Sequence, residues 1–154
     1  MKLPPKPTAA LLEHQEFFKG TPWRPLEKLA ALAGYAHFVD GQVIFCESAT
    51  ADRFHLILSG RVALQTTAPD QRPVTVQILG PGEALGWSWM FPPYQWSFTA
   101  RALEPVETIA FDAPKLRLAS EEDPALGHAV MKRVLRVMLN RLQATRRRLA
   151  ALEH

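Results

Sequence analysis

The sequence has a single cysteine, Cys46, among its 154 residues, and it lacks any long uninterrupted apolar run. One cysteine excludes a disulfide within the chain and fits a reducing compartment. No apolar run approaches the ~20 residues that a helix needs to cross a bilayer. Residues 1–10 carry prolines where a signal peptide would have its apolar segment. We therefore expect a cytoplasmic protein with no membrane partner.

Motifs of common catalytic and metal sites are missing as well. The sequence has no P-loop, no Gly-x-Ser-x-Gly and no Cys-x-x-Cys. His37 and His55 fall in separate predicted strands, and no His-x-His or His-x-x-x-His pair occurs. We expect no catalytic residue, no metal ligand and no cofactor, and thus a protein that is not an enzyme.

Charge is present in ordinary amounts. Charged residues make up 21% of the chain and the formal net charge is +3, which is too small by itself to indicate a nucleic-acid or membrane partner. Hydrophobic residues make up 47%, as in an ordinary soluble protein. The length allows one domain, residues 1–154, with a sizeable core.

Hydrophobic periodicity predicts helices at both ends of the chain and strands between them. Thr8 is a plausible N-cap for a short first helix, and Gly34 is expected to end a second helix over 25–33. Short alternating runs separated by turn signals predict strands throughout 35–111. Asp112 begins a short helix, and Pro124 introduces a long one that reaches about residue 149. The expected parts are thus N-terminal helices (8–34), a β-region (35–111) and C-terminal helices (112–151).

The long helix carries apolar residues spaced alternately by four and three, as in a coiled coil. This pattern predicts a homodimer whose interface contains Met131, Leu135, Met138, Leu142 and Leu149. The run Arg146-Arg147-Arg148 predicts a solvated surface rather than a nucleic-acid patch. The face of the helix opposite the seam is basic. Its residues are Lys132, Arg133, Arg136, Arg141, Arg147 and Arg148.

The stretch 79–102, LGPGEALGWSWMFPPYQWSFTARA, has two strand-like ends around an aromatic insert. Glycines at its start permit tight turns, and Pro92-Pro93 prevents a long helix across it. Three of the four tryptophans of the chain, Trp87, Trp89 and Trp96, lie in this insert. They either fill a vacated pocket or line an open one for a planar or apolar small molecule.

This stretch resembles the phosphate-binding cassette of cyclic-nucleotide-binding domains, the sensor module of catabolite-activator-like regulators. Two further phrases carry the resemblance, FHLILSGRV at 54–62 and GPGE at 80–83. It covers about residues 42–111. It implies a double-stranded β-helix, or jelly-roll, barrel that is mainly β with flanking helices, and a long C-terminal dimerisation helix.

The resemblance also shows that the cassette is degenerate. In the family, a glutamate of the cassette holds the ribose hydroxyl and an arginine holds the cyclic phosphate. Here Gly86 and Ser97 are retained, but Trp87 and Trp96 stand at the two functional positions, so we do not expect cyclic AMP to bind in the usual way. On the last helix, Thr145 falls where the family contacts the base. The predicted ligand-binding residues are Gly86, Trp87, Trp89, Trp96, Ser97 and Thr145.

Three functions remain open. The first is a non-catalytic sensor or regulatory domain for a small-molecule or nucleotide-like ligand. The second is a structural or protein-interaction dimer module with a filled pocket and no ligand. The third, a cupin-like enzyme on the same kind of barrel, is disfavoured because metal-ligand motifs are missing. Because no helix-turn-helix follows the long helix, we expect no direct DNA binding by this chain.

Overall fold

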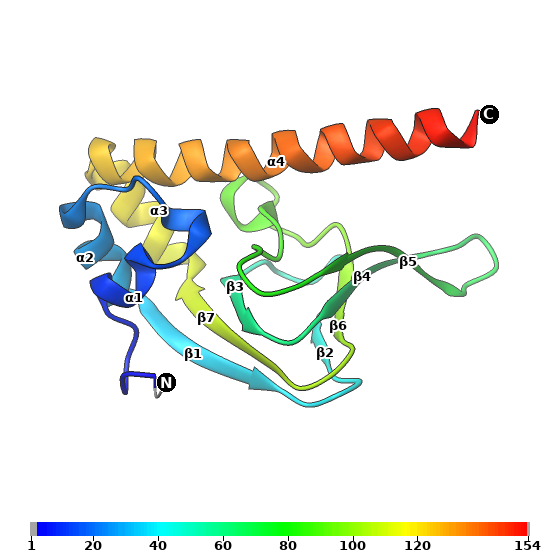
Figure 1. The fold of residues 1–154 in the computed structure, drawn as a ribbon, viewed down its shortest axis with the longest axis horizontal. Helices are drawn as coiled ribbons and strands as arrows, with labels where there is room; N and C mark the ends of the chain where they lie inside the picture. Colours follow the sequence, from blue (N-terminus) through cyan, green and yellow to red (C-terminus); the bar gives the residue numbers. More distant parts are fainter. Residues whose placement is uncertain (1–2, 154) are drawn as a thin grey trace.

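The structure, a computed structural model, describes residues 3–153. Helices stand at both ends of the chain and strands lie between them, as predicted (Figure 1). The N-terminal elements are α1 (Ala9–Glu13), the 3-10 turn η1 (Glu16–Phe18) and α2 (Trp23–Ala31). The strands are β1 (Ala33–Phe38), β2 (Val43–Phe45), β3 (Arg53–Ser59), β4 (Val62–Thr67), β5 (Pro73–Leu79), β6 (Thr99–Ala102) and β7 (Val106–Asp112). A second 3-10 turn, η2 (Ser88–Met90), precedes β6, and the last elements are α3 (Ala113–Glu122) and α4 (Pro124–Leu152).

The strands form two antiparallel sheets, one of order β1-β7-β3 and one of order β2-β6-β4-β5. The mainly β architecture with flanking helices is confirmed, but the sheets do not close into one barrel. Strand β3 lies at the edge of its sheet. Its outer side forms backbone hydrogen bonds with a loop, where a closed barrel would have another strand. Backbone bonds join Ile57 N–H to the Glu83 carbonyl at 3.0 Å and Leu85 N–H to the His55 carbonyl at 3.0 Å.

Gly34 does not end α2, so that prediction is wrong. The helix ends at Ala31, and the N–H of Leu32 bonds to the Leu29 carbonyl at 3.0 Å in an ordinary turn. This ending needs no residue in the left-handed conformation, so a glycine is not required there. Gly34 instead lies inside β1, where it pairs with Ala110 of β7.

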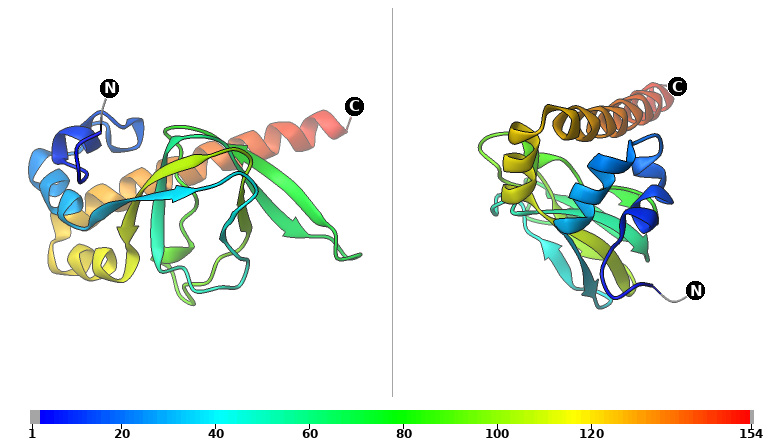
Figure 2. Two further views of the ribbon diagram at one scale, coloured as in Figure 1. Left: turned by 90° about the horizontal axis from the view of Figure 1, so that it is seen from below. Right: turned by 90° about the vertical axis from the view of Figure 1, so that its left-hand side faces the viewer.

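Alternation along β3 separates two apolar cores. Phe54 and Leu56 face the helices, while Ile57 faces the second sheet. The helices α1, α2, α3 and the start of α4 gather at one end of the sheets, as the end-on view shows (Figure 2). The opposite face of β3 also carries the buried His55, whose Nδ1 lies 2.9 Å from the Thr108 hydroxyl of β7.

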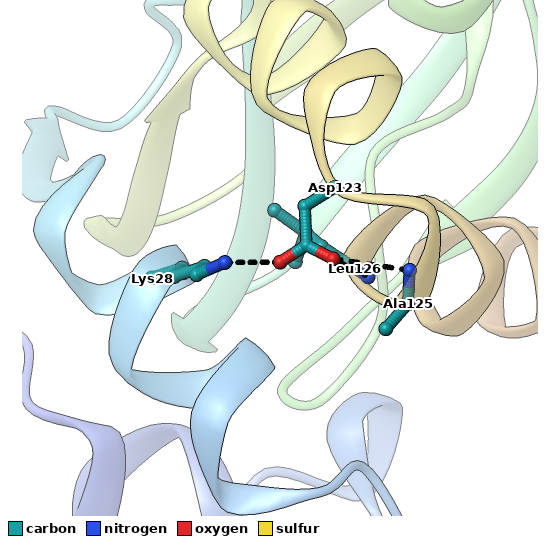
Figure 3. A network of polar contacts seen from close by, with 4 residues as sticks. All are labelled: Lys28, Asp123, Ala125 and Leu126. Carbon is teal, nitrogen blue, oxygen red and sulfur yellow. Dashed lines mark hydrogen bonds and ion pairs between the residues drawn. The ribbon is translucent and has the colours of Figure 1, made fainter.

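The N-terminus of α4 is fixed to α2 by Asp123 (Figure 3). The Asp123 carboxylate accepts from the Ala125 and Leu126 N–H groups, at 3.1 and 3.4 Å, and pairs with the Lys28 ammonium. The hydrogen bond from Lys28 lowers the pKa of Asp123. The capping anion and the cation from α2 together determine where α4 begins.

The two halves of α4 differ in burial. Residues 124–134 contribute Leu126, Val130 and Val134 to the core. Beyond residue 134 the helix continues past the other helices and over the aromatic insert (Figure 1). Large apolar residues are exposed mainly in this second half, among them Leu135, Leu139, Leu142, Leu149 and Leu152.

Candidate functional site

The aromatic insert between β5 and β6 is fixed at both ends by backbone contacts. On one side its residues 82–85 pair with β3. On the other side, the Trp96 carbonyl accepts from Ser48 N–H at 2.8 Å, and Trp96 N–H donates to the Ala49 carbonyl at 2.9 Å. The insert is therefore held on the sheet framework, directly beneath α4 (Figure 1).

Gly86 allows the backbone at the start of the insert to pass close to the Trp96 ring near its end. Its φ of +112° lies in a region that residues with a side chain rarely adopt. A Cβ atom there would lie 3.3 Å from Cζ3 of Trp96, which is tighter than usual packing. The backbone of Gly86 and the Trp96 ring thus approach each other closely.

A cavity of about 670 Å³ lies between the insert, the sheet β2-β6-β4-β5 and the second half of α4. Such a volume is typical of small-molecule sites. Its walls are largely apolar and aromatic. The residues that line it are Phe45, Leu64, Gln77, Leu85, Gly86, Trp87, Ser88, Trp96, Ser97, Phe98, Leu135, Met138, Leu139, Arg141, Leu142 and Thr145.

Five of the six predicted ligand-binding residues are brought together around this cavity. Gly86, Trp87, Trp96 and Ser97 come from the insert, and Thr145 comes from α4. The Thr145 hydroxyl donates to the Arg141 carbonyl at 2.9 Å, so its oxygen still has acceptor capacity.

Trp89 lies elsewhere. Its side chain is 1% exposed and belongs to the helix-covered core. It stacks on Phe54 with ring centroids 5.1 Å apart, and the Trp89 carbonyl accepts from the Arg117 guanidinium of α3. Trp89 therefore attaches the insert to the core and does not line the cavity.

Trp96 forms a flat wall of the cavity together with Phe45 of β2. The two rings stack with centroids 3.8 Å apart and planes 9° apart. The same pair also lines a second, smaller cavity of about 280 Å³ that extends to His55 and Phe38. The stacked pair thus borders both spaces.

Arg141 is a site residue that the sequence pattern assigned wrongly, to the basic face opposite the seam. Its side chain extends from α4 toward the aromatic insert. The guanidinium carbon lies 5.2 Å from the centre of the Trp87 ring, and the guanidinium donates to the Ala84 carbonyl. Burial lowers the pKa of Arg141, while the nearby charge of Glu83 opposes this shift. Helical spacing could have predicted this position, because Arg141 lies three residues after Met138 and four before Thr145 and therefore shares their face of the helix.

The two charged residues within the stretch 79–102, Glu83 and Arg101, lie outside the cavity. The Glu83 carboxylate accepts from Gly80 N–H at 2.7 Å and so stabilises the turn before the insert. Arg101 of β6 donates to the Gly41 carbonyl at 2.8 Å on the outer side of the sheet. Among the residues that line the cavity, Arg141 alone is ionisable.

Within residues 3–153, no group of three or more His, Cys, Asp and Glu side chains gathers as a metal site would. None of the helices in this part of the chain is long and apolar enough to cross a membrane.

The family model of the cyclic nucleotide-binding domain matches residues 35–123. The match ends just before α4. The CRP-like cAMP-activated global transcriptional regulator of Mycobacterium tuberculosis is 28% identical over 142 residues, which make up 92% of this chain. The chain spans 62% of the length of that relative.

Solved structures agree with the family match. A structure described as a cyclic nucleotide-binding protein from Geobacter metallireducens GS-15 superposes with a TM-score of 0.78 at 31% identity, covering 92% of this chain and 99% of the other. A cyclic nucleotide-binding domain from Methylobacillus flagellatus KT gives a TM-score of 0.82 at 18% identity, with coverage of 95% and 86%, and supports the fold alone. These neighbours confirm the predicted jelly-roll fold.

Proposed function

The chain belongs to the cyclic nucleotide-binding domain family, and we propose that it is a non-catalytic small-molecule sensor that does not bind cyclic AMP in the usual way. The observation that carries the proposal is the identity of two cavity residues. Trp87 and Trp96 line the cavity at the positions where the family resemblance expects the ribose-binding glutamate and the phosphate-binding arginine.

A cyclic phosphate needs a cation or several amide donors in the cassette, and arginine supplies a bidentate fork. The Trp96 side chain offers one indole N–H and an apolar face. No carboxylate lines the cavity to accept from a ribose hydroxyl. A ribose phosphate would therefore lose its polar partners on entering this cavity.

The size of the cavity favours a sensor over the alternative of an interaction module with a filled pocket. Trp87 is only half-buried, and Trp96 packs flat against Phe45, leaving about 670 Å³ beside both rings. This arrangement supports an aromatic wall for a ligand.

We also propose that the chain forms a homodimer through α4. Of the five predicted interface residues, Met131, Leu135, Leu142 and Leu149 are 48–61% exposed in the single chain. Exposed apolar side chains at coiled-coil spacing are stabilised by pairing with a second helix. Leu135, Met138 and Leu142 also line the cavity, so the proposed interface adjoins the ligand site.

Calorimetric titration with cyclic AMP tests the sensor proposal. We expect a dissociation constant no better than about 1 mM, because loss of a bidentate charged contact costs ~3 kcal/mol, about a hundredfold in affinity. A micromolar constant would contradict the proposal, since the cavity would then hold the nucleotide without the family's two side chains.

A double variant serves as the positive control. Trp96→Arg with Trp87→Glu restores the two residue types of the family, and the introduced carboxylate would lie near the Arg141 cation. We expect this variant to be less stable alone and to gain thermal stability with cyclic AMP, which would bind only the folded state. A folded double variant with no response at millimolar nucleotide would show that the insert is not a phosphate cassette.

A further inference from the structure

The cavity has an unbalanced charge. Arg141 is the one ionisable residue among its lining residues, and no carboxylate of residues 3–153 lies within ion-pair distance of the Arg141 guanidinium. Glu83 is close enough to influence the pKa of Arg141, but its carboxylate is bonded to Gly80 N–H. A partly buried cation without a counter-ion is unfavourable unless an anion joins it.

The guanidinium is held in a defined position. It donates to the Ala84 carbonyl and lies over the Trp87 ring, so two contacts orient it. The bond to Ala84 is its one hydrogen bond to the described residues, whereas a guanidinium has five N–H donors. Donors therefore remain for the two oxygens of an acid group.

The rest of the wall selects an apolar, flat body. The stacked Phe45 and Trp96 rings present a planar surface, and Leu85, Met138 and Leu142 add aliphatic contacts. A flat hydrocarbon or aromatic body gains contact with such walls, whereas a sugar hydroxyl finds few partners there.

From this geometry we propose that the cavity binds a small acid with a planar apolar body, and that Arg141 anchors the acid group. The assignment rests on the proposed small-molecule function and names its ligand class. Recognition of the anion thus moves from the cassette loop to α4. A ligand so anchored bridges Arg141 and the aromatic insert.

Binding of matched probes tests this. We would titrate the purified full chain with 2-naphthoate and with its neutral counterpart 2-naphthamide, following tryptophan fluorescence and heat. We expect the wild type to bind the carboxylate about 30-fold more tightly than the amide, as loss of a charged hydrogen bond predicts. Equal affinities for the two probes, or no binding of either, would overturn the assignment without the need for any variant.

Three substitutions locate the anchor. Arg141→Gln should weaken naphthoate binding by about 30-fold and change naphthamide binding little, because only the charged contact is lost. Arg141→Lys should keep part of the preference for the acid, since it retains the charge but not the fork. Arg136→Gln, at an exposed arginine of the same helix outside the cavity, should leave both affinities unchanged.

The outcomes separate the two proposals. If Arg141→Gln weakens both probes equally, or neither, Arg141 is not the anchor, and the cavity remains a site for a small molecule. If cyclic AMP binds at micromolar concentration and displaces naphthoate, the usual nucleotide function holds and the sensor proposal fails together with this assignment. If neither probe binds and cyclic AMP binds only at millimolar concentration, the ligand class alone is wrong.

Discussion

Helix α4 covers two regions that use the same residue types differently. Under residues 124–134 lies the closed region, where Trp89 stacks on Phe54 and its side chain is only 1% exposed. Under residues 135–145 lies the open region, where Trp87 and Trp96 border a cavity. Trp89 and Trp87, two residues apart in sequence, thus support the core in one region and border a cavity in the other. Position relative to α4 decides the role of each.

The largest expected effect concerns the outward face of α4, whose large apolar side chains are exposed in the single chain. Met131→Glu together with Leu149→Glu should abolish the proposed dimer, because each interface would bury four unpaired charges. Both residues are more than half exposed, and neither lines the cavity, so ligand binding can be measured separately. Light scattering should show a monomer, while Leu118→Glu on α3 should leave the dimer intact. A monomeric wild type at high concentration would refute the interface.

The second prediction concerns the closed region. Trp89→Ala should lower the free energy of unfolding by about 3–5 kcal/mol, the usual cost of deleting a fully buried aromatic ring. Trp87→Ala should cost clearly less, since Trp87 is half-buried beside a cavity. Urea denaturation of both variants measures the difference.

Trp89→Phe is the matched control for that measurement. The indole N–H of Trp89 is buried without a partner among the described residues, so its removal should cost little. Equal losses for Trp87→Ala and Trp89→Ala would show that both regions are packed alike.

The smallest predicted effect is a pH dependence of the free energy of unfolding, caused by the buried His55 of β3. Burial lowers the pKa of His55 from 6.5 to about 4, with a further contribution from the charge of Arg53. Between these values the unfolded chain binds a proton that the folded chain excludes. Stability is therefore complete above pH 6.5 and declines by about 3 kcal/mol as the pH falls to 4.

Urea denaturation between pH 7 and pH 4 checks this, with variants at two histidines. His55→Gln should remove most of the decline, whereas His128→Gln, at an exposed position of α4, should retain it. If His55→Gln loses as much stability at low pH as the wild type does, titratable groups other than His55 cause the loss.

Much of the fold followed from local signals in the sequence. Thr8, Asp112 and Asp123 accept from N–H groups in the first turns of α1, α3 and α4, and α4 begins at Pro124 as predicted. Capping and strand alternation are local effects, so sequence spacing reports them directly. The closure of the sheets depends on which segment pairs with the edge of β3, and this long-range choice left no local signal.

Most of the residues around the cavity could also be predicted from the sequence. Gly86, Trp87, Trp96, Ser97 and Thr145 were grouped through the family resemblance, and the structure places them around one cavity. Trp89 was grouped with them by proximity in sequence. A 3-10 turn advances about 120° per residue, so η2 directs the side chain of Trp89 away from that of Trp87.

Arg141 was misplaced for a related reason. The sequence pattern assigned it, together with the other basic residues of α4, to the face opposite the predicted dimer seam. The burial of Arg141 depends on contacts with the insert, which is far from it in sequence. The insert supplies the Ala84 carbonyl and the Trp87 ring.

The stacked Phe45 and Trp96 rings also determine how much space is available on either side of them. This one pair borders cavities of about 670 and 280 Å³, so the size of its side chains limits how far a molecule in one cavity could extend into the other. Exchanging Trp96 for a small residue would merge the two spaces and admit longer molecules while leaving α4 and its arginine untouched. Under the proposed function, a single codon at this position therefore offers a route to new ligand selectivity, by natural drift or by engineering.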